Sequence, residues 1–227
     1  MKRAAADAAA ELVEDGMRVG LGSGSTSREF VRALGRRVAS GLNITAVASS
    51  QSTAELASQV GVPLAQLDRP LDLAVDGADA VARSSLAAIK GLGGALTRER
   101  IVAAEAERFV LIVDESKVYD RLDSALADIR IPVAVVPFGW TGTRHRLSRF
   151  GEPDLRMGAA GAPYRTDDGN YILDLRANQA PTPELATQIK ALTGVVDHGL
   201  FLDLAALALV GTPEGVVELR RNDSPLD

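Results

Sequence analysis

Short apolar runs and longer amphipathic segments alternate along the chain as far as about residue 126. The runs predict buried strands at residues 17–21, 44–48, 71–75 and 109–113. The segments between them predict helices at residues 3–14, 26–38, 52–60 and 97–108. Apolar strands that alternate with helices are typical of a mainly parallel sheet with helices on both faces. We therefore expect an α/β fold with a Rossmann-like sheet.

Two of these helices start with the spacing of a capping box. Ser52 precedes Glu55 by three positions, and Thr26 precedes Glu29 by the same distance. In a capping box the hydroxyl and the carboxylate each accept a hydrogen bond from a backbone N–H at the start of the helix. For Thr26, this structural role competes with a role in ligand binding.

The pattern changes after about residue 126. A strand is predicted at 131–136, a basic helical segment around 144–149, a turn at 166–170, a strand at 171–175 and a helix at 182–192. This order predicts a small α+β subdomain, ferredoxin-like in type, over residues 127–199. We expect it to be inserted into an α/β domain formed by residues 1–126 and 200–227.

Composition excludes several kinds of chemistry. The 227 residues contain no cysteine and two histidines, and the net charge is −5. The absence of cysteine excludes disulfides, thiol nucleophiles and iron–sulfur clusters, and so few histidines leave little for a metal site. We therefore expect no metal, and the acidic charge leads us to expect no nucleic-acid or membrane partner. The alanine-rich N-terminus, interrupted by acids, leads us to expect a cytoplasmic protein.

A glycine cluster follows the first predicted strand, at residues 20–26. Glycines let a backbone approach a ligand closely, and the next helix would offer free N–H groups to an anion. Hydroxyl side chains in the same loop add donors, so we interpret Ser23, Gly24, Ser25 and Thr26 as a cradle for a monophosphate. The spacings typical of dinucleotide and nucleoside triphosphate sites are absent. A tight turn without a ligand is the alternative.

Two further strand ends carry candidate chemistry, because ligands bind beyond the carboxyl ends of parallel strands. Asp76 and Asp79 flank a glycine after the third strand, where they could bind sugar hydroxyls or form an ordinary polar turn. Lys90 precedes a glycine-rich loop that opens a helix, and Glu99 lies in its first turn. An acid there also offsets the helix dipole, which is the simpler explanation of Glu99. Lysines are scarce, since only four of the 25 basic residues are lysines. Lys117 lies at the end of the fourth strand, so it and Lys90 both fall where a phosphorylated ligand would lie.

The motifs of the chain, taken in order, resemble the type A ribose-5-phosphate isomerase family over nearly the whole length. They are GLGSGST (20–26), AVASSQST (46–53), DLAVDGADAV (72–81), IKGLGGALTRERIVA (89–103), DESK (114–117), IPVAVVPFGW (131–140), TDDGNYILDL (166–175) and LVGTPEGV (209–216). The resemblance implies interconversion of ribose 5-phosphate and ribulose 5-phosphate through an enediolate, in the pentose phosphate pathway and without a cofactor.

The resemblance also implies roles for individual residues. Glu99 falls on the general base of the family, and Lys90 would stabilise the developing oxyanion. Asp76 and Asp79 would hold hydroxyls and could assist ring opening. Implied contacts with substrate are made by Lys2, Ser23, Gly24, Ser25, Thr26, Asp76, Gly77, Ala78, Asp79, Lys90, Gly91, Leu92, Gly93 and Lys117.

Leu92 departs from the family, which has glycine at this position. If the position required a positive φ, a leucine would be strained there. The resemblance further implies a homodimer, with a tetramer as the alternative. Phe138 and Trp140 could lie in such an interface or, as the alternative, pack in the core. Two other functions stay open on the residues alone, namely a non-catalytic sugar-phosphate sensor and a CoA-transferase-like enzyme of related fold.

Overall fold

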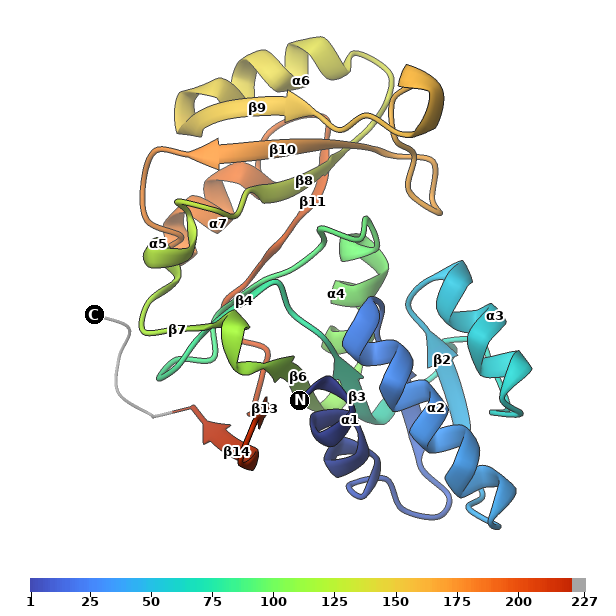
Figure 1. The fold of residues 1–227 in the computed structure, drawn as a ribbon. Helices are drawn as coiled ribbons and strands as arrows, with labels where there is room; N and C mark the ends of the chain where they lie inside the picture. Colours follow the sequence, from blue (N-terminus) through green and yellow to red (C-terminus); the bar gives the residue numbers. More distant parts are fainter. Residues whose placement is uncertain (222–227) are drawn as a thin grey trace.

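Six strands form the sheet at the base of the molecule (Figure 1). In spatial order they are β14 (Gly215–Arg220), β13 (Leu207–Thr212), β6 (Ala106–Asp114), β3 (Leu71–Asp76), β1 (Arg18–Leu21) and β2 (Thr45–Ala48). β14 runs antiparallel to β13, and every other neighbouring pair is parallel. The expected mainly parallel sheet is confirmed in this computed structural model, which describes residues 1–221. Residues 222–227 of the predicted α/β domain lie outside the described range.

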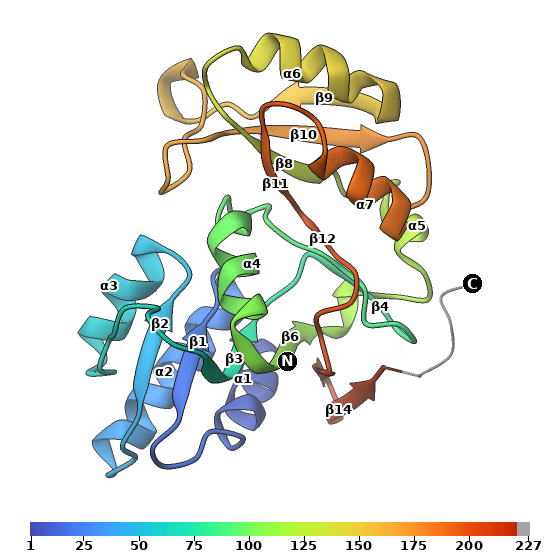
Figure 2. The same cartoon turned by 180° about the vertical axis from the view of Figure 1, so that it is seen from behind.

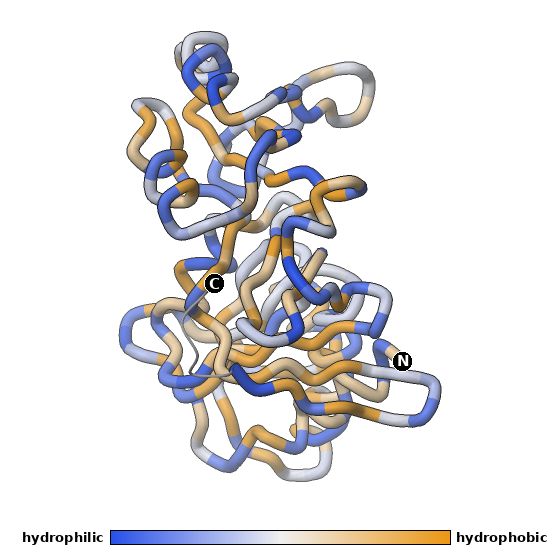
Figure 3. Tube along the Cα trace, turned by 90° about the vertical axis from the view of Figure 1, so that its left-hand side faces the viewer, coloured by the Kyte–Doolittle hydropathy of each residue, from blue (hydrophilic) through white to orange (hydrophobic). Residues whose placement is uncertain are grey.

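Helices cover both faces of the sheet, as the sequence pattern predicts. α1 (Lys2–Ala10), α2 (Ser25–Ala39) and α3 (Gln51–Gln59) pack on one face, and α4 (Leu96–Ala104) packs on the other. Alternate residues of β6 divide between the two cores, because successive side chains of a strand point to opposite faces. In Figure 3 the hydrophobic stretches of the chain run through the interior, with hydrophilic stretches at the outward turns.

The second lobe contains a four-stranded antiparallel sheet in the order β11-β8-β10-β9 (Figures 1 and 2). Its elements are β8 (Ile131–Val135), α6 (Trp140–Leu147), β9 (Gly151–Leu155), β10 (Tyr171–Ala177), α7 (Pro183–Lys190) and β11 (Val195–His198). This β-α-β-β-α-β order is the ferredoxin-like arrangement that the sequence predicts. The domain boundaries after residues 126 and 199 stay predictions.

A third, small sheet links the two lobes. Its strands are β12 (Leu200–Phe201), β5 (Ala88–Ile89), β4 (Ala80–Ala82) and β7 (Val118–Tyr119), and the helix α5 (Leu122–Ala125) follows β7. The sequence analysis did not identify these strands, because two or three residues are too few to show a period. No helix within residues 1–221 is both long enough and apolar enough to cross a membrane.

Some predicted boundaries are wrong. α4 ends at Ala104, four residues before the predicted end, because residues 106–108 already pair with β3. α1 ends at Ala10 rather than near residue 14, and the chain leaves it through a tight turn.

Neither predicted capping box forms. Ser50 rather than Ser52 caps α3, and its hydroxyl accepts a hydrogen bond from the Thr53 backbone at 3.2 Å. The cap of α2 is Gly24, with no side-chain hydrogen bond, so Thr26 lies inside the first turn.

Candidate active site

The loop after β1 leads directly into α2. Gly24 has a φ of +95° and no side chain caps the helix, so the first N–H groups of α2 have no side-chain acceptor. Such a helix start attracts an anion, because unpaired N–H groups and the helix dipole both favour negative charge. Ser25 is exposed at this point, and Thr26 is buried beside it. The phosphate cradle itself stays a prediction.

Ser23 orders the loop through contacts with the protein. Its hydroxyl lies 2.9 Å from the hydroxyls of Ser49 and Ser50, and its backbone N–H donates to Asp76 Oδ1 at 2.9 Å. The hydroxyl of Thr53 completes this cluster by donating to the Gly22 carbonyl at 3.0 Å. The N-terminus of α3 is therefore tied to the back of the loop.

Asp76 joins β3 to the loop after β1. Its Oδ1 accepts hydrogen bonds from Ser23 N, from Ser27 Oγ at 3.0 Å and from Gly77 N at 2.7 Å. Gly22 permits this approach, since a Cβ at that position would lie 1.9 Å from Asp76 Oδ1. Asp76 is 3% exposed, so its main contacts are with the protein itself.

Lys90 lies between two buried carboxylates. Its Nζ is 2.9 Å from Asp76 Oδ2 and 3.4 Å from Glu99 Oε2, and it also donates to the Gly77 carbonyl. Lys90 directly follows β5, whereas Glu99 lies in the first turn of α4. Glu99 Oε2 is buried and accepts no hydrogen bond from the described residues, so the ammonium is its nearby charge partner. The structure thus joins three predicted catalytic residues.

Burial raises the pKa of Glu99 to about 8, against the opposing effect of the Lys90 ammonium. The negative charges of Asp76 and Asp79 also raise the pKa of Glu99. For Lys90, burial alone lowers the pKa, but Asp76 and Glu99 outweigh that effect and raise it. Burial likewise raises the pKa of Asp79, although the Leu92 N–H counteracts this. A carboxyl group whose pKa lies near neutral pH, beside a lysine that stays positively charged, is suited to proton transfer.

The glycine-rich loop before α4 holds Leu92 without strain. Among the described residues other than glycine, only Leu86 has a positive φ, while Gly91 and Gly94 take the left-handed conformations of the loop. The Leu92 N–H donates to Asp79 Oδ2 at 2.9 Å, and the leucine side chain is exposed. The position therefore needs a backbone N–H rather than a glycine.

Two residues of the second lobe hold this loop through hydrogen bonds to its carbonyl groups. Arg156 donates to the carbonyls of Gly91 at 3.2 Å and Leu92 at 2.8 Å, and it pairs with Asp174. The Tyr164 hydroxyl donates to the Gly93 carbonyl at 3.3 Å. Sequence reasoning missed Arg156 and Tyr164 because their partners lie more than 60 residues away along the chain.

Two further lysines approach the same edge of the sheet. Lys2 Nζ donates to Ser25 Oγ at 3.0 Å, next to the start of α2. The positive charge of Lys117 lowers the pKa of Asp79. Ala78 is half-buried between Gly77 and Asp79. The loop, the acids and three of the four lysines are thus gathered at one edge, as the sequence analysis predicts.

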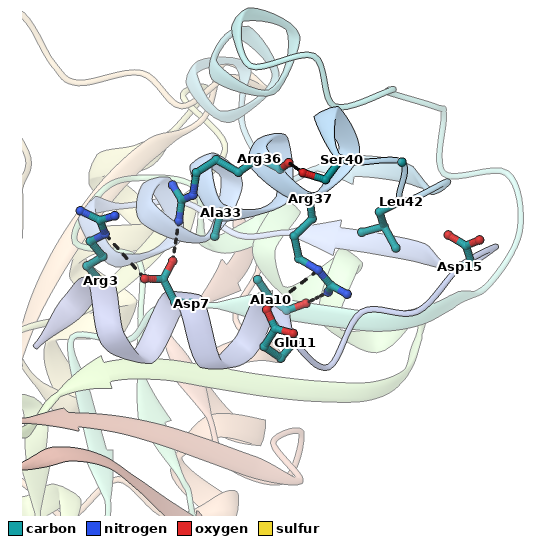
Figure 4. Close-up of a pocket in the computed structure, with 11 residues that line it drawn as sticks. Arg3, Asp7, Ala10, Glu11, Asp15, Ala33, Arg36, Arg37, Ser40 and Leu42 are labelled. Carbon is teal, nitrogen blue, oxygen red and sulfur yellow. Dashed lines mark hydrogen bonds and ion pairs between the residues drawn. The ribbon is translucent and has the colours of Figure 1, made fainter.

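Two other features lie apart from this cluster. A hollow of about 590 Å³ lies between α1 and α2, and its lining residues include none of the predicted site residues (Figure 4). In it, Asp7 pairs with Arg36 at 2.6 Å and with Arg3 at 3.6 Å, so it holds the two helices together. Within residues 1–221, no three His, Asp or Glu side chains are grouped as metal ligands.

The two histidines are also separate from the cluster of Asp76, Lys90 and Glu99. His145 is exposed on α6. His198 is buried, and the Leu200 N–H donates to its Nδ1 at 3.3 Å. Arg100 Nη2 lies 3.4 Å from the same ring nitrogen, so the contacts of His198 are with protein groups.

Comparisons with known proteins converge on one family. Residues 45–215 match the model of the family described as ribose 5-phosphate isomerase A (phosphoriboisomerase A). A ribose-5-phosphate isomerase A from Thermomicrobium roseum is 49% identical over 97% of this chain and 94% of that relative. The enzyme of the same name from Gluconobacter oxydans is 46% identical over 95% of this chain and 94% of that relative.

Solved structures give the same result for the fold. Ribose 5-phosphate isomerase A from Methanocaldococcus jannaschii has a TM-score of 0.92, with 39% identity over 97% of this chain and 98% of that chain. A D-ribose-5-phosphate isomerase in complex with phospho-erythronic acid also has a TM-score of 0.92, with 37% identity over 97% of each chain.

Proposed function

Because this chain belongs to the ribose-5-phosphate isomerase A family, we propose that its buried Lys90–Glu99 pair carries out the proton transfer of that reaction. The chain is an aldose–ketose isomerase that interconverts ribose 5-phosphate and ribulose 5-phosphate. The observation that carries the proposal is the buried Glu99 carboxylate lying 3.4 Å from the buried Lys90 ammonium. No observation favours the sensor or the CoA-transferase alternative.

Glu99 acts as the base. Its ionised carboxylate removes the proton from C2 of the open-chain aldose, and the electron pair of that C–H bond forms the enediolate. The carboxylic acid then returns a proton to C1, while the hydroxyl proton moves between O2 and O1, so substrate and product are isomers. The elevated pKa suits both steps, because the same group must first accept and then donate a proton near neutral pH.

Lys90 stabilises the oxyanion that develops during the transfer. Its ammonium is held by Asp76 at 2.9 Å, so it is already oriented before substrate binds. A preorganised donor of this kind contributes about 3–4 kcal/mol to transition-state stabilisation. Asp76 is accordingly an orienting group for Lys90 and the loop. Asp79 and the loop carrying Leu92 are placed to bind substrate hydroxyls and to assist ring opening.

The start of α2 binds the phosphate. Its free N–H groups, the exposed Ser25 hydroxyl and the Lys2 ammonium lie together at the loop. Lys117 adds positive charge on the side of Asp79. An acidic chain can therefore bind an anionic substrate, because local donors outweigh the net charge at this point. These groups need neither a metal nor a cofactor, so we expect turnover to persist with a chelator.

The assembly and location of the chain are part of the proposal. We assign a homodimer, with Phe138 in the contact between copies because this apolar side chain is 94% exposed. Sedimentation of the wild-type chain tests that assignment. A cytoplasmic location agrees with the metabolic role of the family.

Isotope exchange tests the enediolate. A proton held by Glu99 exchanges with solvent, so sugar phosphates kept at equilibrium in heavy water for many turnovers should gain carbon-bound deuterium. We expect it at C1 of the ketose and at C2 of the aldose. Complete retention of the original hydrogens would instead indicate a direct hydride shift and would contradict the proposed role of Glu99.

A further inference from the structure

Arg100 follows Glu99 on α4 and binds the segment in which the chain crosses from β11 to β12. Its Nε donates to both carboxylate oxygens of Asp197, at 3.0 and 3.1 Å. Its Nη2 donates to the carbonyls of His198 at 2.6 Å and Leu200 at 2.8 Å. One side chain thus satisfies three acceptors on four successive residues of another element.

The acceptors of Arg100 are themselves fixed. Asp197 is 4% exposed, and its Oδ1 also accepts from the His198 N–H at 2.8 Å. Lys190 Nζ lies 3.4 Å from the same oxygen, so two cations balance the buried carboxylate. Burial lowers the pKa of His198 to about 4, so this ring is neutral beside Arg100 at physiological pH. The segment therefore offers Arg100 a rigid anchor.

The same crossing segment also holds Lys90. The Lys90 backbone N–H donates to the Gly199 carbonyl at 2.9 Å, and Phe201 pairs with Ala88 of β5 in the small sheet. Both cations lie over the ring of Phe201, with Arg100 Cζ at 4.2 Å and Lys90 Nζ at 5.4 Å from the ring centroid. The two cations are each favoured by the face of an aromatic ring.

We infer that Arg100 is a positioning residue that sets the separation of Glu99 and Lys90 by fastening α4 to the crossing segment, whose Gly199 carbonyl accepts a hydrogen bond from the Lys90 backbone. Glu99 and Arg100 are consecutive on a helix, so their side chains project about 100° apart. The Glu99 side chain reaches the Lys90 ammonium directly. The Arg100 side chain reaches the crossing segment, to which the Lys90 backbone is hydrogen-bonded. Movement of α4 away from residues 197–201 therefore changes the Glu99–Lys90 distance.

The role rests on the functions proposed above for Glu99 and Lys90, and it acts through them rather than through substrate. The charged groups that act on Glu99 are Lys90, Asp76 and Asp79. Lys90 lowers the pKa of Glu99, so a longer separation raises it. If the distance from Lys90 Nζ to Glu99 Oε2 lengthens from 3.4 Å to about 5 Å, at an effective dielectric constant of about 20, the pKa of Glu99 rises by about one unit.

The test is the pH profile of Arg100→Gln, measured well below its melting temperature. We expect kcat to fall by about 10- to 100-fold, because a misplacement of about 1 Å at reacting groups has an effect of that order. KM should change little, and the acidic limb of the profile should move about one unit to higher pH. Arg100→Lys keeps a cation for Asp197 and should restore most of kcat and the wild-type limb.

Matched variants separate positioning from general damage. Arg98→Gln breaks the exposed pair that joins α4 to Asp168, so it should leave the acidic limb in place. If Arg100→Gln does not fold, Asp197→Asn provides a milder version, with a smaller shift in the same direction. An unmoved limb in the folded variants, or an equal shift in Arg98→Gln, overturns the inference. A wild-type rate in Glu99→Gln would instead refute the proposed base.

Discussion

The Lys90 ammonium lies 3.4 Å from Glu99 Oε2, and both side chains are at most 5% exposed. The cation favours the ionised carboxylate, whereas burial opposes it. Lys90 lies closer to Asp76, at 2.9 Å, and so part of its charge is already neutralised. Burial therefore dominates, and the pKa of Glu99 is raised to about 8 rather than lowered.

The first prediction concerns the rate as a function of pH. Glu99 must be ionised to act as base, so kcat/KM should rise with pH along an acidic limb near the raised pKa of about 8. Asp79→Asn should move the limb to lower pH, because the charge of Asp79 raises the pKa of Glu99. Steady-state kinetics between about pH 4 and about pH 10 would show this. A limb near the ordinary value of 4.5 would contradict it.

The second prediction concerns stability. Because the folded pKa of Glu99 lies above the unfolded value, its contribution to stability is complete below about 4.5 and is lost as pH rises toward about 8. Glu99→Gln removes this loss. The melting temperature of the variant minus that of the wild type should therefore increase from pH 5 to pH 8 and level off above it. A difference that is constant with pH would mean that Glu99 titrates normally.

The third prediction tests the phosphate site at the start of α2. Lys2 is half-exposed and contacts Ser25, so Lys2→Ala should raise KM about fivefold, or about 1 kcal/mol, with kcat little changed. Arg3→Ala is the matched control, since this neighbouring cation pairs with Asp7 and should keep the wild-type KM. Equal effects of the two substitutions would show that only general positive charge matters.

The fourth prediction separates Gly91 from Leu92. Gly91→Ala places a Cβ 2.7 Å from Leu96 Cβ at a φ of +97°, so it should destabilise the protein by about 1–3 kcal/mol. Leu92→Gly keeps the N–H that Asp79 accepts and should lower the free energy of unfolding by less than about 1 kcal/mol. Denaturant unfolding of both variants measures this. A larger loss for Leu92→Gly would reverse the assignment.

Local signals in the sequence predict the large sheet and the main site residues. Four apolar runs predict four of the five parallel strands, and Lys90 and Glu99 stand out because they flank one glycine-rich loop and the helix that it opens. A chain of 227 residues with no cysteine and only two histidines also restricts the chemistry to carboxylates and lysines.

Long-range contacts could not be predicted in the same way. Asp197 is 97 positions from Arg100, and nothing in the spacing of either residue indicates the pair. The cap of α3 depends on which of several adjacent hydroxyls faces the helix, so Ser52 was a reasonable but wrong prediction beside Ser50. Leu92 resembles an exception until the φ values show that Gly91 and Gly94 carry the left-handed turns.

The most direct test of the central claim is kcat of Glu99→Gln with ribose 5-phosphate in the presence of a chelator. The amide keeps the size of the side chain but cannot accept the C2 proton. We expect kcat to fall by about 10²- to 10⁴-fold, the usual contribution of a general base, while ribose 5-phosphate still raises the melting temperature of the variant. Turnover close to the wild-type rate would contradict the account.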